Sequence, residues 1–132
     1  MARRHGADGF ANIQDHNVLG IIFTIRNLRI RISISLPDVS DFALSENGRS
    51  RSEEQAERFR DDEVRRRARC LVLLVKAKFV AVADGLKTIE EEFLPYIVTN
   101  DNEMTVAELF MPKLLEAAKE RRLPSGRLLP AI

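Results

Sequence analysis

Few side chains in this sequence could do chemistry, and the first candidate is the adjacent pair Asp15 and His16. A carboxylate beside an imidazole could act as the orienting group and the general base of a catalytic dyad. Adjacent residues rarely reach that geometry, and the pair lies in a segment with no apolar periodicity. We therefore interpret it as a surface pair.

Two other candidates are an acidic run and a lone thiol. Glu90, Glu91 and Glu92 could bind a divalent cation, but consecutive helical residues point in different directions, and acids in a first turn favour the helix dipole. Cys70 begins an apolar stretch, where we expect an inert small hydrophobe. With one cysteine and two histidines, one chain cannot assemble a closed zinc site. We expect no metal, no cofactor and no catalytic residue, so the chain is not expected to be an enzyme.

Arginines are the remaining candidates, and they could bind another macromolecule. Residues 65 to 69 hold four arginines, but residues 53 to 69 contain six acids and six arginines. Acids stand four residues before Arg58, Arg65, Arg66 and Arg67, which is the favourable order for helical ion pairs. This pattern favours a solvated helix face over a surface that binds the phosphates of a nucleic acid. The candidate macromolecule-binding residues are Arg26, Arg29, Arg31, Arg65, Arg66 and Arg69, with Arg3 and Arg4 as further nucleic-acid contacts.

The composition bounds the class of protein. The chain has 132 residues, is 45% hydrophobic and 31% charged, and has a net charge of +1, so it has no global field that would steer it onto a polyanion. One cysteine fits a reducing compartment, and no apolar run approaches the roughly 20 residues that span a bilayer. We expect a cytoplasmic protein with no membrane partner.

The N-terminal third predicts a hairpin. Residues 1–17 have no apolar period and are interpreted as a flexible arm that precedes one α+β domain, residues 18–132. After Gly20, apolar residues alternate, and the alternation changes phase at Arg26 and Asn27. A two-residue turn there would place Ile25 opposite Leu28; one long strand with a bulge is the alternative.

Three capping boxes predict three helices. Ser52 with Gln55, Thr88 with Glu91, and Thr105 with Glu108 each precede residues of helical spacing. The first helix meets no Gly or Pro before Gly85, so it would be about 48 Å long, although a compact domain of this size is about 36 Å across. It must kink, project or be covered by a second subunit.

The apolar residues of these helices are expected to form the core. The stripe in the first helix comprises Ala68, Leu71, Val72, Val75, Phe79 and Val82, broadened by Leu74, Ala77 and Ala81. The second helix ends at Pro95, and the polar residues 99–102 indicate a short hairpin or a tight extended excursion. In the third helix Pro112 should kink the helix or divide it, and residues 123–132 are interpreted as an extended tail.

The C-terminal half resembles a known group of proteins. Residues 65–98, "RRRARCLVLLVKAKFVAVADGLKTIEEEFLPYIV", followed by a polar turn and "TVAELFMPKLLEAA", are similar to small uncharacterised proteins of bacterial phages and mobile elements. The resemblance covers about residues 65 to 130. It implies a compact accessory protein of a mobile element, in a group rich in inhibitors that bind host machinery and poor in enzymes.

These observations give one expected architecture and two functional hypotheses. We expect an α+β fold, mostly helical, with an N-terminal β-hairpin packed on a long central helix with two shorter helices. The first hypothesis is a non-enzymatic protein-binding inhibitor of a host protein, of an anti-defence type, which could also form a homodimer. The alternative is a nucleic-acid-binding accessory protein that uses the hairpin arginines.

Overall fold

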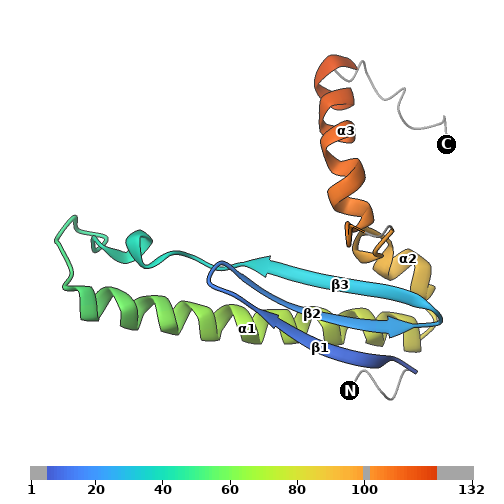
Figure 1. Cartoon of the computed structure of the whole chain (residues 1–132), viewed down its shortest axis with the longest axis horizontal. Coiled ribbons are helices and arrows are strands. Elements are labelled where there is room, and N and C mark those ends of the chain that lie inside the picture. The colour runs from blue at the N-terminus through green and yellow to red at the C-terminus, as the bar shows by residue number, and fades with distance from the viewer. Residues whose placement is uncertain (1–5, 100–101, 122–132) are drawn as a thin grey trace.

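The computed structural model describes residues 6–99 and 102–121 and has the expected α+β architecture (Figure 1). A three-stranded antiparallel sheet has the order β1, β2, β3, with β1 at Asp8–Gln14, β2 at Val18–Ile25 and β3 at Leu28–Ser35. The 3-10 helix η2, Val39–Phe42, leads to the long helix α1, Glu53–Ala83. Helix α2, Ile89–Phe93, continues into the 3-10 helix η3, Leu94–Tyr96, and α3 spans Val106–Arg121.

The predicted hairpin is confirmed in its position and its register. Arg26 and Asn27 have φ angles of 49° and 65°, as the two central residues of a type I′ turn require. Ile25 lies opposite Leu28 and Phe23 lies opposite Ile30. A two-residue turn therefore explains the phase change, and the single bulged strand is excluded.

Residues 8–14 correct the interpretation of an N-terminal arm. They form β1, which pairs with β2 in the register Ala11 opposite Ile22 through Gln14 opposite Leu19. The register shifts between Asp8 and Ala11, and Gly9 has a φ of 63°, so the alternation of side chains is interrupted in the sequence as well. Residues 1–5, which include Arg3 and Arg4, lie outside the described residues.

Helix α1 lies along one face of this sheet (Figure 1), and the hydrophobic core lies between the two. Three fully buried phenylalanines meet there, with ring centroids 5.3 to 5.7 Å apart: Phe23, Phe79 and Phe93. Ile25, Ile30 and Ile32 cover them from β2 and β3. Because each such side chain contributes about 1.5–3 kcal/mol when buried, this cluster dominates the stability of the fold.

Helix α1 is continuous, and its first half forms hydrogen bonds with main-chain segments at the ends of the strands. Its 31 residues make it about 46 Å long, and Ser52 and Gln55 form the predicted capping box. Arg60 donates hydrogen bonds to the carbonyl oxygens of Pro37 and His16, and Arg67 donates to that of Ser35. The molecule is therefore elongated along α1 (Figure 1), which resolves the conflict between helix length and domain diameter.

The C-terminal half confirms two predicted caps and the short hairpin. Thr88 caps α2, and Thr105 exchanges hydrogen bonds with Glu108 at the start of α3. The Thr99 N–H donates to the Met104 carbonyl, and Val98 bridges to Thr105.

Pro112 lies inside α3, which remains one helix, so the expected division does not occur. The expected kink at Pro112 stays a prediction. Residues 123–132, the predicted tail, lie outside the described residues.

Candidate interaction surfaces

Two of the three hairpin arginines are used within the chain. Arg29 pairs with Glu103 at 2.9 Å. Arg31 pairs with Glu108 and also donates to the carbonyl oxygen of Glu103 at 3.0 Å. Both side chains therefore hold the short hairpin and α3 against β3. Arg26 lies exposed in the turn, so the predicted patch is reduced to one arginine without an ion pair among the described residues.

Ion pairs along α1 also neutralise most of the second arginine group, with partners that partly differ from the prediction. Glu54 pairs with Arg58 and Glu63 pairs with Arg67, as expected from the four-residue spacing. Arg65 and Arg66 instead pair three residues back, with Asp62 and Glu63.

Glu63 therefore receives two guanidinium groups. Hydrogen bonds from Arg66 and then Arg67 lower its pKa to about 2, while desolvation opposes them. Its carboxylate raises the pKa of Arg66 in turn.

Arg69 is the exception among the candidate arginines of α1. Its side chain is exposed and has no ion-pair partner among the described residues. Arg60 and Arg67, which sequence reasoning did not single out as anchors, donate to main-chain carbonyls instead. No sequence signal distinguishes an anchoring arginine from a solvated one, because the acceptor is a backbone atom far away in the chain.

Asp15 and His16, the candidate dyad, contact separate partners. The Asp15 carboxylate accepts the main-chain N–H groups of Asn17 and Val18, at 2.8 and 2.9 Å. His16 lies 3.0 Å from Asp38 instead, and this contact lowers the pKa of that carboxyl group. In the part of the chain that the structure describes, no three His, Cys, Asp or Glu side chains gather as metal ligands would.

The acidic run of α2 serves structure as well. Glu91 completes the capping box with Thr88, whose backbone N–H and hydroxyl lower the Glu91 pKa. Glu92 pairs with Lys78 of α1 at 3.2 Å, and both side chains are mostly buried. The cap interpretation is confirmed for Glu91, and Glu92 fastens α2 to α1.

The apolar stretch of α1 corrects the predicted core stripe at Val72 and Leu74. Leu71, Val75 and Phe79 are buried against the sheet. Val72 and Leu74, both assigned to that stripe, are 58% and 39% exposed. Leu73 and Val80, which lie outside the predicted stripe, are exposed too. Cys70 is exposed on this outer side, 3.8 Å from a guanidinium nitrogen of Arg66, and is not the expected buried hydrophobe. In the described part of the chain no helix is long and apolar enough to cross a membrane.

Helix α3 presents a second exposed apolar face. It projects from the sheet and from α1 beyond its docked first turn (Figure 1). Phe110 and Met111 are each 47% exposed, and Leu114 and Leu115 are 61% and 63% exposed. At 100° per residue these four side chains and Ala118 fall on one side of the helix. We call this set the α3 face.

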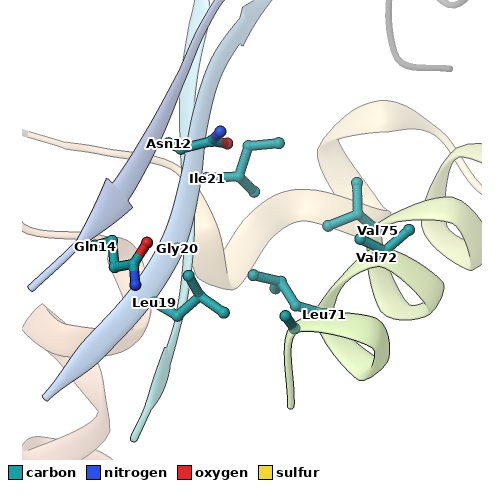
Figure 2. A pocket seen from close by; sticks show the side chains of 9 residues that line it. Asn12, Gln14, Leu19, Gly20, Ile21, Leu71, Val72 and Val75 are labelled. Atoms are coloured by element: carbon teal, nitrogen blue, oxygen red, sulfur yellow. The ribbon is translucent and has the colours of Figure 1, made fainter. Parts of the chain in front are cut away.

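A groove opens between the sheet edge and α1 (Figure 2). It has a volume of about 260 Å³. Apolar side chains from β2 and α1 form most of its lining, and Asn12 and Gln14 of β1 supply amide groups at its border. The groove residues are Asn12, Gln14, Leu19, Gly20, Ile21, Ala68, Leu71, Val72 and Val75.

The proposed function rests on these surfaces and not on similarity to another protein. The chain matches no family model, no curated protein and no solved structure.

Proposed function

We propose that this chain is a small non-enzymatic interaction protein that binds another protein through the α3 face. The observation that carries the proposal is the exposure of Phe110, Met111, Leu114 and Leu115 together on a helix that projects from the fold. Contiguous apolar patches on soluble proteins typically mark interaction sites. An amphipathic helix that inserts its apolar side into a groove of a partner is a recurrent mode of recognition.

The proposed partner is a host protein of a phage or mobile element. The resemblance of residues 65–130 to small phage and mobile-element proteins supports this choice, and α3 lies within that span. The chain would act as an inhibitor of a host defence or replication protein in the cytoplasm. An inhibitor of this kind needs a binding surface and no catalytic group.

The alternative, a nucleic-acid-binding accessory protein, has weaker support. It requires arginines that are free to meet phosphates. Arg29 and Arg31 already contact Glu103 and Glu108, and Arg65 and Arg66 contact Asp62 and Glu63. Of the six candidate arginines, Arg26 and Arg69 are left, one in the β2–β3 turn and one on α1.

Affinity capture from a bacterial lysate tests the proposal, with tagged chain as bait and nuclease present. We expect one host protein to be enriched by the unmodified chain and lost with the double variant Leu114→Glu/Leu115→Glu. Glu116→Lys, which changes the charge on the opposite side of α3, should retain the partner. Circular dichroism should show equal helix content in all three baits.

Three outcomes would contradict the proposal. Capture that is unaffected by the double variant would place the contact elsewhere. Retention on heparin that falls steeply with salt, together with capture that nuclease abolishes, would favour the nucleic-acid alternative. Light scattering that shows a homodimer lost with Leu114→Glu/Leu115→Glu would make a second copy of the chain the occupant of the α3 face.

A further inference from the structure

We propose that the groove between β1 and α1 is a second binding site, which accepts an extended peptide segment as a strand added to the free edge of β1. The segment would carry an apolar residue flanked at alternate positions by two acidic residues, all three facing α1. This site is separate from the α3 face, and its partner class follows from the geometry of the groove.

The outer edge of β1 has main-chain groups available for a further strand. The Asp15 N–H donates to the Val18 carbonyl of β2, so alternate residues of β1 face β2 and the intervening Asn12 and Gln14 direct their N–H and C=O groups outward. Residues 9–14, "GFANIQ", contain no charge and no proline, although natural edge strands usually carry such protection. The opposite edge, β3, is covered: Ile97 bridges to Ile30, and the Val98 N–H donates to the Arg29 carbonyl.

The groove lies where side chains of an added strand would project. Neighbouring strands are about 4.8 Å apart, so a strand beyond β1 would direct alternate side chains into the space beside α1. That space has Val72, 58% exposed, on the α1 side and the amides of Asn12 and Gln14 on the β1 side (Figure 2). An apolar side chain of the added segment would cover Val72 and remove its surface from water.

Two exposed cations flank this position on α1. Arg69 stands three residues before Val72 and Lys76 stands four after it, which places both beside Val72 on the helix surface. They are seven residues apart, or about 10.5 Å along the helix axis. Residues four apart on one face of a strand are about 13 Å apart. A segment with the pattern acid, any, apolar, any, acid therefore matches the apolar centre and both cations together.

A second copy of this chain fits the groove less well. Antiparallel pairing of two β1 edges around a two-fold axis would place both α1 helices on the same face of the joined sheet. Arg69 and Lys76 of each copy would then approach those of the other across the axis, with no acid of β1 between Gly9 and Gln14 to separate them. Like charges that face each other are unfavourable, whereas an acidic segment complements them.

Titration of the isotope-labelled chain with the peptide acetyl-TETITET-amide, followed by amide NMR shifts, tests this site. We expect saturable shifts at Asn12, Gln14 and Val72 and no shifts in the α3 face. The variant Arg69→Glu/Lys76→Glu should weaken binding by about tenfold or more. Lys113→Glu/Lys119→Glu is the matched control, since it makes the same change of charge on α3, and its affinity should equal that of the unmodified chain.

Two altered peptides separate strand addition from simple charge attraction without changing the protein. In antiparallel pairing with β1, the isoleucine that faces α1 directs its N–H toward β1. N-methylation of this isoleucine should therefore abolish binding. The lysine peptide acetyl-TKTITKT-amide should not bind.

The proposal would be overturned if either altered peptide bound as tightly as the acidic peptide, if shifts were confined to α3, or if the acidic peptide did not bind. Concentration-dependent shifts at β1 without peptide would also overturn it, since they would indicate self-pairing. If the acidic peptide does not bind, the α3 capture experiment is unaffected, because that experiment uses different variants and a different readout.

Discussion

Arg31 on β3 and Glu108 in the first turn of α3 form an ion pair across 77 positions of the sequence. The same carboxylate oxygen accepts the backbone N–H and the hydroxyl of Thr105, at 2.9 and 3.1 Å. The Thr105 N–H contributes most to lowering the pKa of Glu108, and its hydroxyl and Arg31 add to it. Capping of α3 and attachment of α3 to the sheet therefore depend on one carboxylate.

Replacing Arg31 with alanine should loosen α3 without unfolding the sheet. The Arg31 side chain is only 18% exposed, and the variant would lose both the ion pair with Glu108 and the hydrogen bond to the Glu103 carbonyl. We expect a loss of about 1–2 kcal/mol in the free energy of unfolding, with faster hydrogen exchange in α3. Urea denaturation and amide exchange measure the two effects.

Arg29→Ala is the control for this prediction. The Arg29 and Glu103 side chains are about half exposed, so their pair should contribute less than about 1 kcal/mol. Equal losses for the two variants would contradict the assignment of Arg31 as the principal anchor.

The parts of the fold that the sequence predicted are those with local causes. The hairpin turn at Arg26 and Asn27 follows from alternation that changes phase within two residues, and the three caps depend on side chains three positions apart. Strand β1 was missed because its bulge interrupts the alternation and its pairing partner supplies much of the order. The exposure of Val72 and Leu74 was missed because hydrophobicity indicates that a helix face favours burial and does not indicate what will cover it.

The ion pairs of the candidate arginines also separate into local pairs that the sequence predicted and distant pairs that it did not. The sequence showed that charges along α1 are balanced locally, and the ion pairs confirm this, with two partners shifted by one residue. It could not show that Arg29 and Arg31 meet Glu103 and Glu108, because those acids lie more than 70 residues away and only the folded chain brings them to β3.

Gly20 should not tolerate a side chain. A Cβ at this position would lie 2.9 Å from the main-chain oxygen of Ile32 and 3.0 Å from the Cβ of Ser33, so β2 and β3 would have to separate. We expect Gly20→Ala to lower the free energy of unfolding by about 1–3 kcal/mol, measured by urea denaturation. Gly48→Ala tests a different cause, since its added Cβ meets nothing within 4 Å and any loss there reflects its φ of +78°. Unchanged stability of Gly20→Ala would show that the strands adjust freely.

Arg26→Asn should stabilise the hairpin. Arg26 has a φ of 49°, a left-handed conformation that asparagine adopts more readily than arginine. We expect a gain of about 0.5–1 kcal/mol, seen as a higher midpoint in thermal unfolding. Arg26→Lys keeps both the charge and the strain and should leave the midpoint unchanged. A lower midpoint for Arg26→Asn would mean that the arginine makes a stabilising contact outside the described residues.

Glu63 should make the stability of the chain sensitive to acid over a defined range. Its pKa is about 2 in the folded chain against an ordinary value of 4.5, because Arg66 and Arg67 donate to the carboxylate. A pKa lowered by folding means that the unfolded chain binds protons first as the pH falls. The contribution of Glu63 is therefore complete above about pH 4.5 and is lost progressively as the pH falls to about 2.

The variant Glu63→Gln should lower the unfolding midpoint at pH 7 and flatten its decline between pH 4.5 and pH 2. Thermal unfolding followed by circular dichroism across this range measures both effects. Glu54→Gln is the matched control, since it removes an acid of the same helix whose contact with Arg58 is longer, at 3.8 Å, and both of whose side chains are exposed. If the two variants have the same acid profile, the paired guanidinium groups of Arg66 and Arg67 do not stabilise the ionised form of Glu63, and the charge balance along α1 contributes to solubility alone.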